Sequence, residues 1–166
     1  MTVVHDPIEE TEADADAGPA ARARRIVLEQ HIELRRLLRM GMAQAQAAMK
    51  RRVLPHESLR ALLVMIREVF VQHLADEEAL ILPLLDDDLP LGPLRAKRLR
   101  EEHAGQRMEL ERLCSWPEEE SHDLELILRF EGLGTALLDD ITHEERELLT
   151  PEIIRDDGIV VDQSGG

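Results

Sequence analysis

Apolar residues recur at three- and four-residue steps along most of the chain, which is the spacing of one face of an α-helix. We predict four helices: over about residues 21–52, from Pro55 to the segment "DDDLPLGP", over about residues 93–114, and from the segment "SWPEEE" to Thr150. No stretch alternates with the period of a β-strand. Each amphipathic helix must cover its apolar stripe with its neighbours, so the pattern predicts an all-α, up-down-up-down four-helix bundle.

The two ends of the chain lack this periodicity. Residues 1–20 are acidic and rich in alanine, which is typical of a disordered tail. Residues 153–166, which end in "GIVVDQSGG", predict a flexible C-terminal tail. The bundle then occupies residues 21–152 as a single domain, and at 43% hydrophobic residues the chain has enough apolar side chains for a core.

Charge and cysteine content narrow the setting. The formal charge of -15 would repel nucleic acid and anionic membranes, so we expect neither as a partner and regard cations as the natural ligands. Cys114 is the one cysteine, which excludes an internal disulfide. The N-terminal residues lack the features of a secretion signal, and no apolar run reaches the roughly 20 residues of a membrane span. These features favour a reducing cytoplasm.

Histidine and glutamate follow a pattern that the chain repeats. A single His-x-x-x-Glu spacing is weak evidence in a chain with 35 acidic residues, as His5 and Glu9 in the tail illustrate. The repeat is more specific, because each half carries one histidine and, 42 or 40 positions later, a His-x-x-x-Glu pair. The residues of the repeat are His31, His73 and Glu77 in the first half, and His103, His143 and Glu147 in the second.

The spacing places each histidine and its glutamate on the same helix face, about one turn apart. Burial of four imidazoles and two carboxylates without a partner would cost several kcal/mol per ionised group. Imidazole and carboxylate ligands without cysteine suit iron, manganese or zinc, and two carboxylates suit a dinuclear site. We therefore predict a buried metal site, with exposed histidines on charged faces as the alternative.

This series of residues on four helices resembles the hemerythrin-like (HHE cation-binding) domain family over about residues 20–152. The resemblance implies a non-haem centre of two Fe ions, with Mn or Zn as alternatives. It further implies that His31 and His73 bind one iron, that His103 and His143 bind the other, and that Glu77 and Glu147 bridge the two.

The family includes oxygen carriers, sensors, proteins that react with nitric oxide or peroxide, and iron-centre repair proteins. The resemblance thus implies a di-iron protein that binds or reacts with dioxygen, nitric oxide or peroxide, in a sensing, detoxifying or iron- and redox-handling role. Two alternatives remain open: a di-iron oxidase or peroxidase that acts on a substrate, and an iron-handling cargo protein whose "GIVV" tail docks on an assembly.

Two further residues lie near the predicted site. Oxygen-carrying members have a second histidine one turn after the helix-three histidine, and this chain has Arg107 there. The resemblance to an oxygen carrier is therefore incomplete, and we expect Arg107 either to extend to solvent or to pair with a carboxylate or a bound anion. Asp139, one turn before His143, is a candidate acceptor for an imidazole N–H, with an exposed acidic residue as the alternative.

Overall fold

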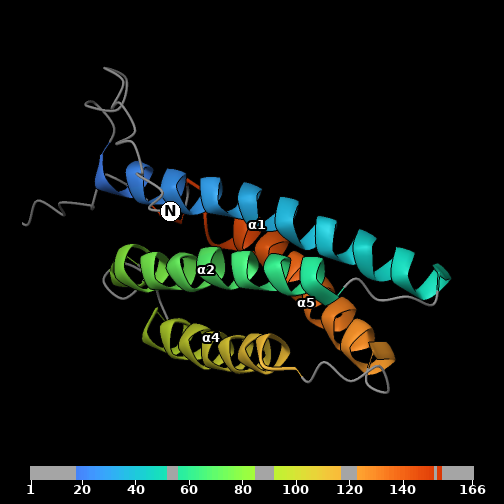
Figure 1. Cartoon of the computed structure of the whole chain (residues 1–166). Coiled ribbons are helices and arrows are strands. Elements are labelled where there is room, and N and C mark those ends of the chain that lie inside the picture. The colour runs from blue at the N-terminus through green and yellow to red at the C-terminus, as the bar shows by residue number, and fades with distance from the viewer. Residues whose placement is uncertain (1–17, 52–55, 85–91, 117–122, 152, 155–166) are drawn as a thin grey trace, which may run out of the picture.

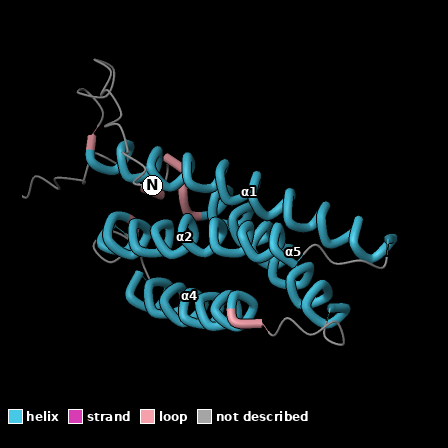
Figure 2. Tube along the Cα trace, in the orientation of Figure 1, coloured by secondary structure: helices cyan, strands magenta, loops and turns pink. Residues whose placement is uncertain are grey.

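The protein is a bundle of four long helices, described by a computed structural model over residues 18–51, 56–84, 92–116, 123–151 and 153–154. The helices are α1 (Pro19–Arg51), α2 (His56–Leu80), α4 (Gly92–Cys114) and α5 (Asp123–Glu147), and these ranges contain no strand. Successive helices run in opposite directions (Figure 1), and helix dominates the described chain (Figure 2). The predicted all-α, up-down-up-down architecture is confirmed.

The helix boundaries differ from the predicted ones by a few residues. Helix α1 begins at Pro19, where the fixed φ of proline and its missing N–H suit the first turn. Helix α2 ends at Leu80, before Pro83, rather than at the later "DDDLPLGP" segment. Ala20 and Ile154 are buried, so the packed region extends slightly beyond residues 21–152. The rest of both predicted tails lies outside the described residues.

The apolar core has two parts that are separated along the bundle axis. The larger cluster includes Leu34 of α1, Leu74 of α2, Leu110 of α4 and Ile141 of α5. The smaller cluster includes Val27, Ile81, Ala96 and Leu149. The two clusters are about two turns apart along α1, α2 and α5, and nearly four turns apart along α4, from Ala96 to Leu110. This intervening layer holds the five buried polar side chains of the described chain: His31, His73, Glu77, His103 and Glu144.

Helices α1 and α5 approach closely within the larger cluster. A Cβ atom at Gly41 of α1 would lie 2.3 Å from the ring of Phe130 of α5 and 3.2 Å from Leu62 of α2. Glycine therefore sets the distance at which these helices can pack. None of the described helices has the length and apolar character that a membrane span requires.

Candidate metal centre

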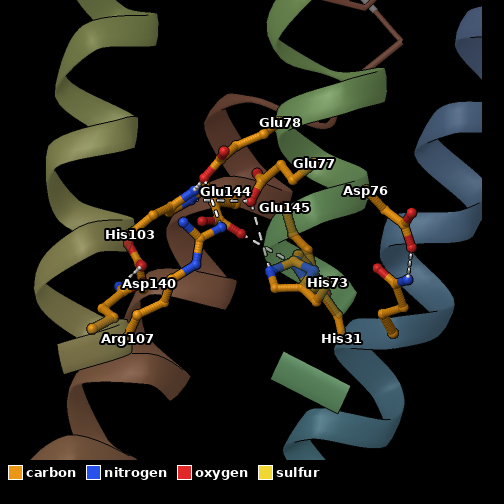
Figure 3. A network of polar contacts seen from close by, with 12 residues as sticks. His31, His73, Asp76, Glu77, Glu78, His103, Arg107, Asp140, Glu144 and Glu145 are labelled. Atoms are coloured by element: carbon orange, nitrogen blue, oxygen red, sulfur yellow. Dashed lines mark hydrogen bonds and ion pairs between the residues drawn. The ribbon is translucent and has the colours of Figure 1, made fainter. Parts of the chain in front are cut away.

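The buried polar layer brings together side chains from all four helices (Figure 3). His31, His73 and Glu144 form one group of potential ligands, and Glu77, His103 and Glu144 form a second. Within each group the ligand atoms lie within 4.8 Å of one another. Glu144 belongs to both groups, so the layer offers two adjacent positions to cations.

Glu77 also lies between the two groups. Its Oε2 atom is 3.6 Å from Nε2 of His73 and 3.3 Å from Nε2 of His103. On the other side, Oε2 of Glu144 is 3.2 Å from Nε2 of His31. Two carboxylates and three imidazoles therefore surround a small volume, which is the donor set that a dinuclear centre uses.

An ion pair outside the layer fixes the orientation of His31. The Arg35 guanidinium forms two hydrogen bonds to the Glu145 carboxylate, one of them at 2.7 Å, and lowers the pKa of Glu145. An ionised carboxylate can only accept, so Nδ1 of His31, 3.1 Å from Glu145 Oε1, carries the proton and donates it. The Nε2 lone pair of His31 then points into the layer.

His103 has the same arrangement on the opposite side. Nδ1 of His103 lies 3.1 Å from Oε1 of Glu78, which also accepts a hydrogen bond from Arg107 at 2.9 Å. Burial raises the pKa of Glu78, but His103 and Arg107 lower it by more. This carboxylate is therefore ionised and is an acceptor as well. Carboxylates that hold the outer nitrogen of a histidine are typical partners of metal-binding imidazoles.

The inner atoms of the layer lack hydrogen bonds. Among the described residues, no hydrogen-bond partner exists for Nε2 of His31 and His103, for either carboxylate oxygen of Glu77, or for Oε2 of Glu144. A nitrogen lone pair and a carboxylate oxygen about 3 Å apart repel each other unless a proton or another cation lies between them. The closest Nε2 to oxygen distances, 3.2 and 3.3 Å, therefore mark places for cations.

The pKa shifts of the buried histidines and glutamates indicate that the layer lacks positive charge. Burial, with His31 and His103 nearby, lowers the pKa of His73 to about 3, so this imidazole is neutral and able to bind a metal. Burial raises the pKa of Glu144 to about 7. Burial lowers the pKa of His103, but Glu77 and Glu78 raise it by more. The residues present thus fit a metal centre of oxygen and nitrogen ligands, such as iron, manganese or zinc.

Four of the six residues that the repeat singles out lie in this layer: His31, His73, Glu77 and His103. His143 and Glu147 do not. Their side chains are 65% and 67% exposed and form a pair on the outside of α5, with Nδ1 of His143 3.5 Å from Oε1 of Glu147. The expectation that this pair faces the bundle interior is wrong, and Glu144 occupies the interior position of α5.

The rotation of α5 explains the difference. Its buried side is formed by Phe130, Leu133, Leu137 and Ile141. At 3.6 residues per turn, Glu144 lies roughly 20° around the helix from Leu137, whereas His143 lies about 120° away. The buried residues of α5 therefore continue into Glu144. The counterpart of the His73-x-x-x-Glu77 spacing on this helix is Asp140-x-x-x-Glu144, in which Asp140 accepts a hydrogen bond from Gln106 at 2.5 Å.

Arg107 adopts one of its two expected arrangements, because it pairs with the carboxylate of Glu78. Asp139 is exposed, and the acceptor role considered for it is filled by Glu78 and Glu145 at two other histidines. The sequence held a signal for these acceptors. His31 and Arg35 recur as His103 and Arg107, and Glu77-Glu78 recurs as Glu144-Glu145.

A pocket of about 330 Å³ leads from the surface to this layer between α4 and α5. Its lining residues are Arg98, Leu99 and Glu102 of α4, Asp140, His143, Glu144 and Glu147 of α5, and Leu148. Glu144 is only 5% exposed and also belongs to the buried layer. The pocket therefore connects the exposed His143 and Glu147 to a candidate metal ligand.

A family model for the hemerythrin HHE cation-binding domain matches residues 22–150, which include nearly all of the four helices. The chain belongs to this family. No curated protein and no solved structure matches it. The family match and the two buried ligand groups together define a metal-binding four-helix bundle.

Proposed function

We propose that the chain holds two iron ions in the buried layer between its two apolar clusters. His31, His73 and Glu144 would hold one ion, and His103, Glu77 and Glu144 the other. The observation that carries this proposal is the approach of inward-facing Nε2 atoms to carboxylate oxygens at 3.2 and 3.3 Å without hydrogen bonds. Glu144 takes the bridging role that the family resemblance assigned to Glu147.

Iron in these positions would supply redox chemistry and sites open to dioxygen, nitric oxide or peroxide. The chain's own residues support such chemistry in three ways. Glu145 and Glu78 hold the imidazoles of His31 and His103 in one orientation. The two apolar clusters exclude water above and below the layer. Glu144 connects the layer to the pocket between α4 and α5.

A role in sensing, detoxification or iron handling fits this chain better than reversible oxygen storage. Arg107 stands where oxygen carriers have a further histidine, and it pairs with Glu78. The pocket reaches the surface and is lined mostly by charged residues, so it is not the closed, apolar cavity that would favour simple binding of a diatomic ligand. A reducing cytoplasm would suit such a role and agrees with the single cysteine.

A second candidate is a di-iron oxidase or peroxidase that acts on a substrate. The pocket of about 330 Å³ supports it, because a diatomic ligand needs far less space. Its carboxylates would favour a neutral or cationic substrate over an anionic one. The third possibility, a cargo protein docked by "GIVV", concerns residues 158–161, which lie outside the described residues.

Metal analysis with an optical spectrum tests the proposal. Protein reconstituted without oxygen should bind about two irons per chain, because two ligand groups are present. Exposure to air should then produce charge-transfer absorption in the near-ultraviolet. Binding of one zinc ion per chain, with iron excluded, would contradict the proposal.

A further inference from the structure

The pocket between α4 and α5 has an outer and an inner end. His143 and Glu147 are exposed at its outer end, and the buried Glu144 lies at its inner end. All three belong to the last two turns of α5, so a cation that reaches the first two residues is already close to the third.

The charges of the pocket favour cations. Its lining includes the carboxylates of Glu102, Asp140, Glu144 and Glu147, against one guanidinium, that of Arg98. Arg98 is itself paired with Glu102 at 2.8 Å, and its side chain is 80% exposed. Concave surfaces that carry one sign of charge raise the local concentration of the opposite charge and speed its association.

The inner end of the pocket contains a buried group that can bind a cation. Oε2 of Glu144 is buried and has no hydrogen-bond partner among the described residues, although it lies at ion-pair distance from His31. An acidic pocket alone would be an ordinary solvated surface. With an unsatisfied carboxylate oxygen at its inner end, it leads to a group that needs a cation.

The outer pair has the chemistry of a transient ligand. His143 and Glu147 offer one nitrogen and one oxygen, 3.5 Å apart, to the same point. These donors suit Fe²⁺ and similar cations. Two exposed donors bind weakly, because water competes for the remaining coordination positions. A cation held there is therefore easily released to a buried group with more ligands.

We propose that the pocket is the route by which divalent cations reach the buried layer, with His143 and Glu147 as a transient outer binding site. This inference rests on the proposed function, since it assumes that the layer binds metal. It assigns the exposed pair on α5 to the uptake of metal, whereas the final ligands are the buried residues. Arg98, as the one positive charge in the lining, slows the approach of cations.

Uptake rate and final metal content distinguish these roles. Metal-free protein is mixed with Co²⁺ in a stopped-flow instrument and its visible absorption is followed; the bound metal is then measured after equilibration. The double variant His143→Ala, Glu147→Gln should bind Co²⁺ about tenfold more slowly than wild type, with unchanged final content. Arg98→Gln should bind it faster.

Glu125→Gln is the matched control, because it also removes one negative charge from an exposed position of α5, outside the pocket lining. It should bind Co²⁺ at nearly the wild-type rate. An unchanged rate in the double variant would overturn the proposed route, and a loss of final content would make the pair true ligands. If wild type binds no metal at all, the proposed function itself fails, which is a separate result.

Discussion

At the scale of single residues, the centre depends on which imidazole nitrogen carries the proton. Glu145 and Glu78 accept from Nδ1 of His31 and His103, so both Nε2 lone pairs face inward. Arg35 and Arg107 keep these carboxylates ionised. Each series of arginine, glutamate and histidine thus fixes one orientation of the imidazole ring, with its Nε2 atom toward the metal position.

We predict that Glu78→Gln and Glu145→Gln each weaken metal binding about 10- to 100-fold, because an amide can donate to the ring and no longer fixes its tautomer. Competition with a chromophoric chelator measures the affinity. The control is Glu68→Gln, an exposed position on α2 that should leave affinity unchanged. Equal losses in all three variants would indicate that overall charge, rather than the hydrogen bond, determines affinity.

At the scale of helices, apolar periodicity predicted the four elements, their order and their antiparallel arrangement, and the His/Glu repeat predicted four of the five residues in the buried layer. Neither pattern predicted the rotation of α5. A His-x-x-x-Glu spacing has the same geometry wherever it occurs on a helix, and only the apolar neighbours decide which side is buried. Here Leu137 and Ile141 bury Glu144 and leave His143 outside. The contacts of Glu78 and Glu145 join different helices, so they depend on packing that one helix's sequence does not contain.

Because α1 packs closely against α5, we predict opposite changes in stability when alanine replaces a buried and an exposed glycine. Gly41→Ala should destabilise the protein by about 1–3 kcal/mol, because the new methyl group overlaps the buried ring of Phe130, and the gain in helix propensity offsets only part of this. Gly132→Ala is the control. It is exposed on α5 with no atom within 4 Å of the new Cβ, and it should stabilise by up to about 1 kcal/mol. Urea unfolding of metal-free protein measures both, and a stabilising Gly41→Ala would contradict the packing.

At the scale of the whole molecule, a polar layer interrupts the apolar core and ties stability to metal. Buried carboxylates without a cation destabilise the fold, and a bound metal removes this cost. Replacement of such groups by apolar residues is often neutral or stabilising. The polar layer therefore makes the metal-free bundle less stable than one with an apolar layer in the same place.

We predict that saturating metal raises the Tm of the wild type by roughly 5–10 °C, from the ligand-linked free energy expected for a chain of this size. Glu144→Leu should keep or raise the Tm of the metal-free protein and abolish most of the increase with metal. Glu147→Leu, at an exposed position, should retain the full increase. Calorimetry with and without metal makes the comparison, and a metal-free Glu144→Leu protein that unfolds well below wild type would contradict it.

The most direct test is the iron content of wild type, Glu144→Ala and Glu147→Ala after identical reconstitution and removal of loosely bound metal. Because Glu144 belongs to both ligand groups and Glu147 is exposed, wild type and Glu147→Ala should each retain about two irons per chain, and Glu144→Ala should retain less than about one. If Glu147→Ala loses its iron while Glu144→Ala keeps both ions, the centre is not the buried layer that joins the four helices.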